Sequence, residues 1–176
     1  MVHALNATFS GNEAGNGGGA LENDHVYPSQ VELVQASLVD NRGWNAAVEG
    51  GFASRRSLLA NTGANCFVPN GMTLDDAGGN FASDASCAGF NLASREAMAL
   101  GPLADNGGPT PTHALLPGSV ALDVEGDCTD LAGHPVGSDQ RGFARPADGD
   151  GDGIARCDAG AYERTGDTVF ADGFDG

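Results

Sequence analysis

The chain has 176 residues, with 28 glycines and eight prolines, and its 24 acidic side chains outnumber eight basic ones, all arginine, for a net charge of −16. This length fits one domain, or one large domain with a small appendage. The charge argues against nucleic acid and anionic membrane surfaces as partners, because both need cations against phosphate, and no run approaches the roughly 18 apolar residues of a membrane span. The excess of acidic side chains leaves carboxylates available for divalent cations, or simply makes an acidic extracellular surface.

Three strand-like runs in the first part of the chain each end on an asparagine. The runs are residues 7–12, 36–41 and 56–61. Glycine-rich corners alternate with them, at residues 17–21, 48–52 and 78–81. A unit of strand, asparagine turn and glycine corner that recurs every 20 to 30 residues predicts a β-solenoid, in which each coil pairs with the next. A β-sandwich with irregular loops is the alternative, since it also has short strands and glycine-rich turns.

The repeat predicts about three coils, with a fourth that merges into a disulfide loop. Asn12, Asn41 and Asn61 are expected to form a ladder of side-chain amides from coil to coil, in left-handed turns. Small aliphatic residues such as Leu38 and Leu58 are expected to point into the narrow core. The first coil is expected to expose an open, unpaired edge.

Four cysteines form an even set without a CxxC pair: Cys66, Cys87, Cys128 and Cys157. Zinc sites usually place two ligands within two to four residues of each other, so two disulfides in an oxidising compartment are the better prediction. Four cysteines allow three pairings, and the order along the chain favours Cys66–Cys87 and Cys128–Cys157. No signal peptide precedes them, because Met1 leads directly into VHALNATFSGN. We therefore expect the chain to be a fragment of a longer exported protein.

Few residues are candidates for catalysis. Arg55, Arg56 and Glu49 could serve a polysaccharide lyase or hydrolase, but an adjacent arginine pair is more simply surface charge. His113 is expected to be packed and hydrogen-bonded, and the remaining histidines, His3, His25 and His134, have no partner at metal or triad spacing. There is no nucleophile elbow, P-loop or dinucleotide motif, so we predict that this chain is not itself an enzyme.

Charged residues late in the chain predict loop-fastening pairs and a metal site. Asp139, Arg141 and Arg145 are expected to form bidentate pairs that hold loops together. The run DGDGDGI at residues 148–154 matches the first half of an EF-hand-type calcium loop. Its second half fails, because position twelve is Ala159. The predicted Ca²⁺ ligands are Asp148, Asp150, Asp152, the carbonyl of Ile154, and Asp158; a solvated acidic turn is the alternative.

Three segments resemble the C-terminal module of choice-of-anchor Q proteins, bacterial β-helix proteins of the pectin lyase-like type. They are GPLADNGGPTPTHALLPGSVALDV at 101–124, SDQRGFARP at 138–146 and CDAGAYE at 157–163. Residues 119–124 depart from the usual proline-containing run but keep Asp123. We read residues 110–116 and 119–124 as short strands. The resemblance implies a right-handed parallel β-helix of an exported protein, whose C-terminal end this module closes.

The combined prediction is an all-β, right-handed, single-stranded parallel β-helix of about three coils with a loop-rich, disulfide-pinned C-terminal cap. Residues 1–99 would be the last coils, 100–164 the cap, and 165–176 a flexible acidic tail that resembles the short IFADGFE endings of some exported proteins. The predicted role is structural or adhesive, at the cell surface or secreted, with upstream coils of the same protein as partner. The alternatives are part of a carbohydrate-active β-helix (a polysaccharide lyase or glycoside hydrolase), or a module that binds cell-surface glycan. For glycan binding, Trp44 and Tyr27 are the only obvious aromatic candidates, and anchoring of loops is the alternative role for both.

Overall fold

The computed structural model describes residues 1–23, 29–69, 71–124 and 127–166. The described residues are nearly all β, with fourteen strands and one short helix, α1 (Arg95–Met98). The predicted tail lies outside them from residue 167 on, as do His25 and Tyr27.

Twelve strands form three parallel sheets. Sheet A contains β1 (Val2–Leu5), β4 (Gln30–Val34), β7 (Gly51–Arg55) and β10 (Asp75–Asp76). Sheet B contains β2 (Thr8–Ser10), β5 (Ser37–Val39), β8 (Leu58–Ala60), β11 (Phe81–Ala82) and β12 (Asn91–Leu92). Sheet C contains β3 (Glu13–Asn23), β6 (Arg42–Val48) and β9 (Cys66–Phe67).

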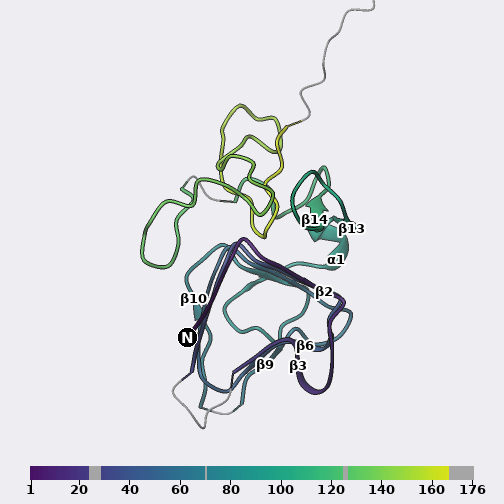
Figure 1. Cartoon of the computed structure of the whole chain (residues 1–176), viewed down its shortest axis with the longest axis vertical. Helices are drawn as coiled ribbons and strands as arrows, with labels where there is room; N and C mark the ends of the chain where they lie inside the picture. Colours follow the sequence, from purple (N-terminus) through teal and green to yellow (C-terminus); the bar gives the residue numbers. More distant parts are fainter. Residues whose placement is uncertain (24–28, 70, 125–126, 167–176) are drawn as a thin grey trace, which may run out of the picture.

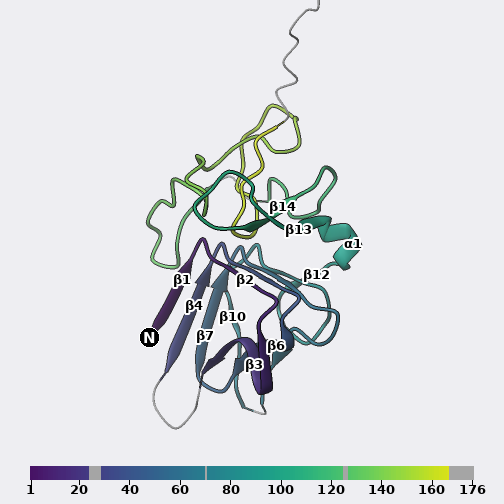
Figure 2. The same ribbon diagram turned by 45° about the vertical axis from the view of Figure 1, so that its right-hand side comes forward.

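The chain visits these sheets in turn, so neighbouring strands differ by three in number, except for β11 and β12. We call one circuit through the three sheets a coil, and residues 2–92 the stack. Successive coils overlie one another in Figure 1, and Figure 2 shows β1, β4 and β7 side by side. Three coils are complete and a fourth is partial, as the repeat predicted.

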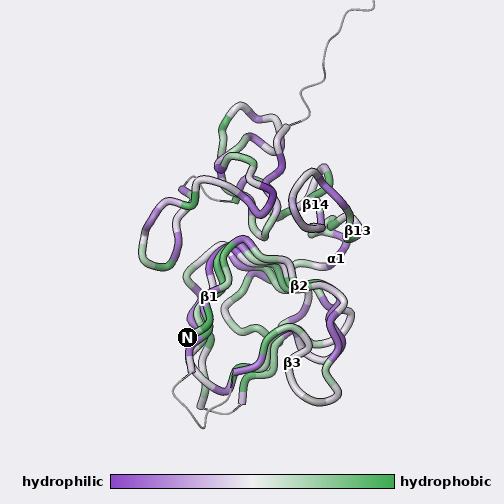
Figure 3. The backbone as a smooth tube through the Cα atoms, viewed as in Figure 1, coloured by the Kyte–Doolittle hydropathy of each residue, from purple (hydrophilic) through white to green (hydrophobic). Residues whose placement is uncertain are grey.

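The core of the stack follows from the repeat register. Phe9, Leu38 and Leu59 are aligned in sheet B and point into one internal cluster. Leu33 and Phe52 of sheet A lie in the same cluster. Figure 3 shows that apolar stretches recur at corresponding places in successive coils. Burial of such aligned side chains, at roughly 25 cal/mol per Å² of apolar surface, favours stacking of one coil on the next.

The asparagine ladder is present at the turn between sheets B and C. Asn41 Oδ1 accepts hydrogen bonds from Asn12 N and Asn12 Nδ2, both at 2.9 Å, and Asn61 Oδ1 accepts from Asn41 N at 3.0 Å. The left-handed backbone lies one residue earlier than predicted, at Gly11 (φ 67°) and Asp40 (φ 55°). Each bend is therefore made by one residue and fastened by the asparagine that follows it.

The cap contains one antiparallel hairpin, β13 (Leu100–Ala104) with β14 (Thr112–Leu115). The hairpin contains the strand predicted for residues 110–116. The strand predicted for residues 119–124 is wrong, because this segment consists of turns. The Ser119 hydroxyl accepts a hydrogen bond from Ala121 N, and Asp123 has a left-handed φ of 50°. A short polar side chain that bonds its own backbone competes with a strand ladder.

The position of the cap also differs from the prediction. Rather than closing the last coil, it packs along the outer face of sheet B (Figures 1 and 2). Leu58, expected to point into the core, instead contacts this module with Leu115 and Ala159. The approach is close, since a Cβ on Gly160 would lie 2.7 Å from Ser37 Oγ. The middle strands of sheet B, β5 and β8, are therefore buried on both faces, which suits a continuous apolar strand such as β8.

Both predicted disulfides form. Cys66–Cys87 joins β9 to the loop of the fourth coil, across 21 residues. Cys128–Cys157 closes a 29-residue segment within the cap. By the loop-entropy account each stabilises the fold by roughly 3 kcal/mol.

Candidate functional site

Within the part of the chain that the structure describes, no strand pairs with the outer edges of the first coil. β1, β2 and β3 are each the terminal strand of their sheet, and all three belong to the first coil. The edge of β3 is irregular, because its pairing with β6 shifts register at Gly18. Such irregularity discourages pairing with another chain. The edges of β1 and β2 are regular, as the predicted open first coil requires.

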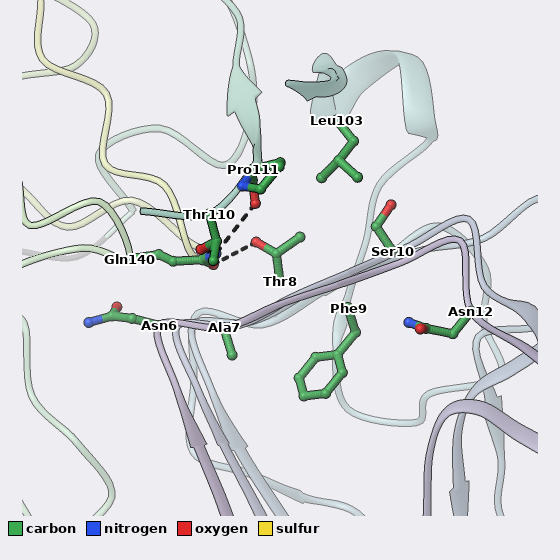
Figure 4. Close-up of a pocket in the computed structure, with 10 residues that line it drawn as sticks. All are labelled: Asn6, Ala7, Thr8, Phe9, Ser10, Asn12, Leu103, Thr110, Pro111 and Gln140. Carbon is green, nitrogen blue, oxygen red and sulfur yellow. Dashed lines mark hydrogen bonds between the residues drawn. The ribbon is translucent and has the colours of Figure 1, made fainter. Parts of the chain in front are cut away.

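A groove runs along the free edge of β2, between the stack and the cap (Figure 4). Its volume is about 470 Å³. One wall is β2 with its flanking turns, and the other comes from the cap. The lining residues are Asn6, Ala7, Thr8, Phe9, Ser10, Asn12, Leu103, Thr110, Pro111 and Gln140.

Polar side-chain contacts hold the walls of the groove together. Asn6 Nδ2 donates to the carbonyl oxygen of Ser138 in the cap at 2.6 Å. Thr8 Oγ1 donates to Gln140 Oε1 at 2.7 Å, and Gln140 Nε2 donates to Thr110 Oγ1 at 2.8 Å. Ser10 Oγ lies 2.8 Å from Nε2 of His113, whose Nδ1 lies 2.8 Å from the carbonyl oxygen of Gly101. A carbonyl only accepts, so Nδ1 carries the proton and Nε2 accepts from the Ser10 hydroxyl. His113 is therefore the buried, hydrogen-bonded residue that the sequence predicted.

The predicted calcium ligands are only partly brought together. Asp148 and Asp150 form a cluster with Asp123, in which one carboxylate oxygen of each lies within 4.8 Å of the others. Asp152 instead pairs with Arg156 at 3.0 Å. Asp158 is buried and accepts from the backbone N–H of Asp123 at 2.8 Å.

The loop's own amides already occupy these carboxylates. Asp123 accepts backbone hydrogen bonds from residues 149, 150 and 156, and Asp148 accepts from residues 151 and 153. The Ile154 side chain is exposed and its N–H donates to Asp152. Asp150 also accepts from the N–H of Asp152. An oxygen-only donor set suits a hard cation such as Ca²⁺, but a cation would have to compete with six N–H groups. Asp123 was missed because it lies 25 positions before Asp148 in the chain.

Two buried ion pairs hold the cap. Arg141 pairs with Asp139 as predicted, but its Nε and Nη2 both contact the single oxygen Oδ2, at 2.8 and 2.7 Å, so the pair does not use both carboxylate oxygens. Arg145 Nη1 pairs with Glu163 Oε2 at 2.6 Å. Burial raises the pKa of Glu163 to about 7 and that of Asp158 to about 6, although Arg145 opposes both shifts. Glu163 was not predicted as the partner of Arg145, since no spacing rule relates them.

The residues considered for catalysis are not assembled. Arg56 was expected to be surface charge, and this is wrong: its side chain is fully buried and contacts Asp127 at 3.3 Å and the Thr129 carbonyl at 3.0 Å. Arg55 Nη1 donates to the Asp130 carbonyl. Both arginines lie at the turn from sheet A to sheet B, where the cap covers the stack. Glu49 lies at a different turn, between sheets C and A.

The other single residues have simple surroundings. His134 is exposed, and its Nδ1 lies 3.1 Å from Oδ2 of Asp130, four residues earlier in the chain. His3 lies on the exposed strand β1. Trp44 stacks on Phe67 with ring centroids 4.4 Å apart, on the strands of sheet C. Among the described residues, no helix is long and apolar enough to cross a membrane.

Comparison with models of known families, with curated proteins and with solved structures finds no match to this chain. The resemblance to the choice-of-anchor Q module therefore stays a prediction.

Proposed function

We propose that this chain is a non-catalytic structural or adhesive segment of an exported bacterial protein, and that its stack continues a right-handed parallel β-helix. The observation that carries the proposal is the strand order: apart from β11 and β12, neighbouring strands in each of the three sheets are three apart in number. Parallel strands joined by crossovers are right-handed in nearly all proteins. Each coil forms the same backbone hydrogen-bond ladder with its neighbour as the coil before it. This architecture therefore supports the addition of further coils rather than a closed active site.

The proposed location is the cell surface or the extracellular medium. Two disulfides support it, because such bonds persist in oxidising compartments. The net charge of −16 is compatible with an acidic, soluble surface. The choice-of-anchor Q-like module would then pack against the side of these last coils and stabilise them. Upstream coils of the same protein would be the partner of the stack.

The experiment compares the chain made in an oxidising and in a reducing compartment, followed by assays with polyuronates and neutral glycans. We expect a stable product only in the oxidising compartment, and neither unsaturated nor reducing sugar products. Release of either product by the purified chain would refute the non-catalytic proposal in favour of a carbohydrate-active enzyme.

A glycan-binding module is the second candidate, and the stacked pair of Trp44 and Phe67 favours it. Phe67 is 36% exposed, and an exposed aromatic face can pack against the C–H face of a sugar ring. Binding of a glycan without turnover, lost in Trp44→Ala, would support this candidate over a purely structural role.

A further inference from the structure

The cap extends past the last strand that it covers. Along the outer face of sheet B it contacts Leu58 of the third coil, Ser37 of the second, and Ser10 of the first. Beyond β2 the cap continues through Leu103, Thr110 and Pro111, which line the groove where no strand of the described residues lies. Leu103 is 47% exposed there. The cap thus covers a place in sheet B next to β2 that the described chain does not fill.

The free edge of β2 has the backbone groups that a further strand needs. Ala7 O accepts from Ser37 N at 2.9 Å and Gly11 N donates to Val39 O at 3.2 Å, so these residues face the second coil. Successive residues of a strand direct their N–H and C=O groups to alternate edges. Thr8 and Ser10 therefore direct theirs into the groove. In Figure 4 their side chains point toward the cap, whereas Phe9 points the opposite way.

The groove follows β2 along its length, since Thr8, Phe9 and Ser10 all line it. The strands β5 and β8 of the same sheet have the same length of three residues. One short strand of the repeat would therefore match the groove in length.

We infer that this groove is an acceptor site for one further sheet-B strand, parallel to β2, with the chemistry of this chain's own repeat. The inference rests on the proposed function, since it takes the stack to be one that another coil extends. The interaction repeats the established pairing of β2 with β5 and of β5 with β8. Main-chain hydrogen bonds to Thr8 and Ser10 would give the affinity, and an outward side chain against Leu103 and Pro111 would give selectivity.

The probe is a synthetic peptide that copies residues 35–41, QASLVDN, added to the oxidised full chain. At the two ends of β5, Ala36 O accepts from Leu58 N of β8, and Asp40 N donates to Ala60 O of β8. If the peptide lies on β2 in the same register, the backbone groups of its alanine, leucine and aspartate would form the corresponding hydrogen bonds with β2. We expect saturable binding at submillimolar to millimolar concentration, because a short peptide loses conformational entropy on binding. Amide exchange at Thr8 and Ser10 should slow at least fivefold, while that at Ala7 and Phe9 should not change.

Matched variants and a modified peptide distinguish binding of the peptide in the groove from nonspecific binding. Leu103→Arg places a charge in the groove and should weaken binding at least tenfold. Leu92→Arg, at an exposed leucine on the opposite edge of sheet B, should have no effect. A peptide N-methylated at its leucine lacks a required donor and should not bind.

Three results would overturn the inference: no slowing at Thr8 and Ser10 at millimolar peptide, equal loss with Leu92→Arg, or equal binding of the methylated peptide. Self-association that only Leu103→Arg abolishes, without any peptide effect, would assign the groove to a second copy instead. A stable, inert chain that leaves Thr8 and Ser10 unprotected would remove this inference and leave the proposed function intact.

Discussion

The stack and the cap are stabilised in different ways. The stack repeats one backbone ladder, with aligned core residues such as Leu38 and Leu59 and an asparagine ladder at one turn. The cap has one hairpin and few further backbone pairs among its described residues, and buried charges and a disulfide hold its loops. Damage to one coil should therefore be shared with its neighbours, whereas damage to one contact in the cap should release a whole loop.

The largest expected effect comes from breaking the buried pair of the cap. Arg145→Met leaves the Glu163 carboxylate buried without its cation, which should cost about 3–5 kcal/mol. The matched control is Arg42→Met, since the pair of Arg42 with Glu13 is exposed to solvent and its loss should leave stability nearly unchanged. Chemical denaturation measures both. Equal losses in the two variants would contradict the contrast between buried and exposed charge.

Removing the two disulfides one at a time should destabilise different regions, the cap in one variant and the stack in the other. The double change Cys128→Ser with Cys157→Ser should cost roughly 3 kcal/mol, and Cys66→Ser with Cys87→Ser a similar amount. The distribution of the damage should differ: limited proteolysis should cut within residues 128–157 in the first variant, and β5 and β8 should stay protected in amide exchange. Loss of protection throughout the stack in the first variant would show that cap and stack unfold as one unit.

These two regions also differ in how far the sequence predicts them. A repeat translates directly into register, so the three coils and the inward Leu38 could be predicted from spacing alone. Both disulfides could be predicted from the order of the cysteines along the chain. The brace-like position of the cap could not, because nothing in the local pattern of Leu58 says that its side chain points outward to Leu115. The same holds for buried Arg56. Partners such as Asp123 with Asp148, or Arg145 with Glu163, depend on how irregular loops cross, and spacing carries no signal for that.

Loss of the asparagine ladder should have a smaller effect than loss of the buried pair. In Asn41→Ala the buried side-chain oxygen of Asn45 loses its donor Asn41 Nδ2, and the partly buried Phe9 O loses the same donor. Unsatisfied buried groups of this kind cost about 1–3 kcal/mol. Asn91→Ala is the control, because this exposed residue gives one amide hydrogen bond, to Asn80 O, and should change stability by about 0.5 kcal/mol or less. A loss in Asn91→Ala as large as in Asn41→Ala would argue against the ladder.

The cap should lose stability as pH rises above the acid range. Burial raises the pKa of Glu163 from 4.5 to about 7 and that of Asp158 from 3.8 to about 6. Folding then favours the protonated carboxyls, so their contribution is present at low pH and is lost as pH rises through about 6 to 7. Arg145, Asp139 and the Arg141 side chain surround these groups. The melting temperature should be higher at about pH 5 than at about pH 8, and Glu163→Gln should flatten the difference. A profile that rises with pH would reverse the assigned sign.

Calcium should have the smallest effect, since Asp123, Asp148 and Asp150 already accept hydrogen bonds from the loop's N–H groups. With a millimolar Kd, typical of weak extracellular sites, about 5 mM Ca²⁺ would stabilise the chain by about 1 kcal/mol. That corresponds to a rise of about 2–4 °C in melting temperature, which a chelator should reverse. Asp148→Asn should abolish the rise, while Asp152→Asn should retain it, because Asp152 pairs with Arg156 outside the cluster.

If Asp152→Asn abolished it as well, the ligands would follow the linear EF-hand pattern after all, and the loop would have to rearrange around the ion. No rise in the unmodified chain would mean that the amides hold these carboxylates more tightly than a cation can, and the disulfide and the buried ion pairs would remain the main fastenings of the cap.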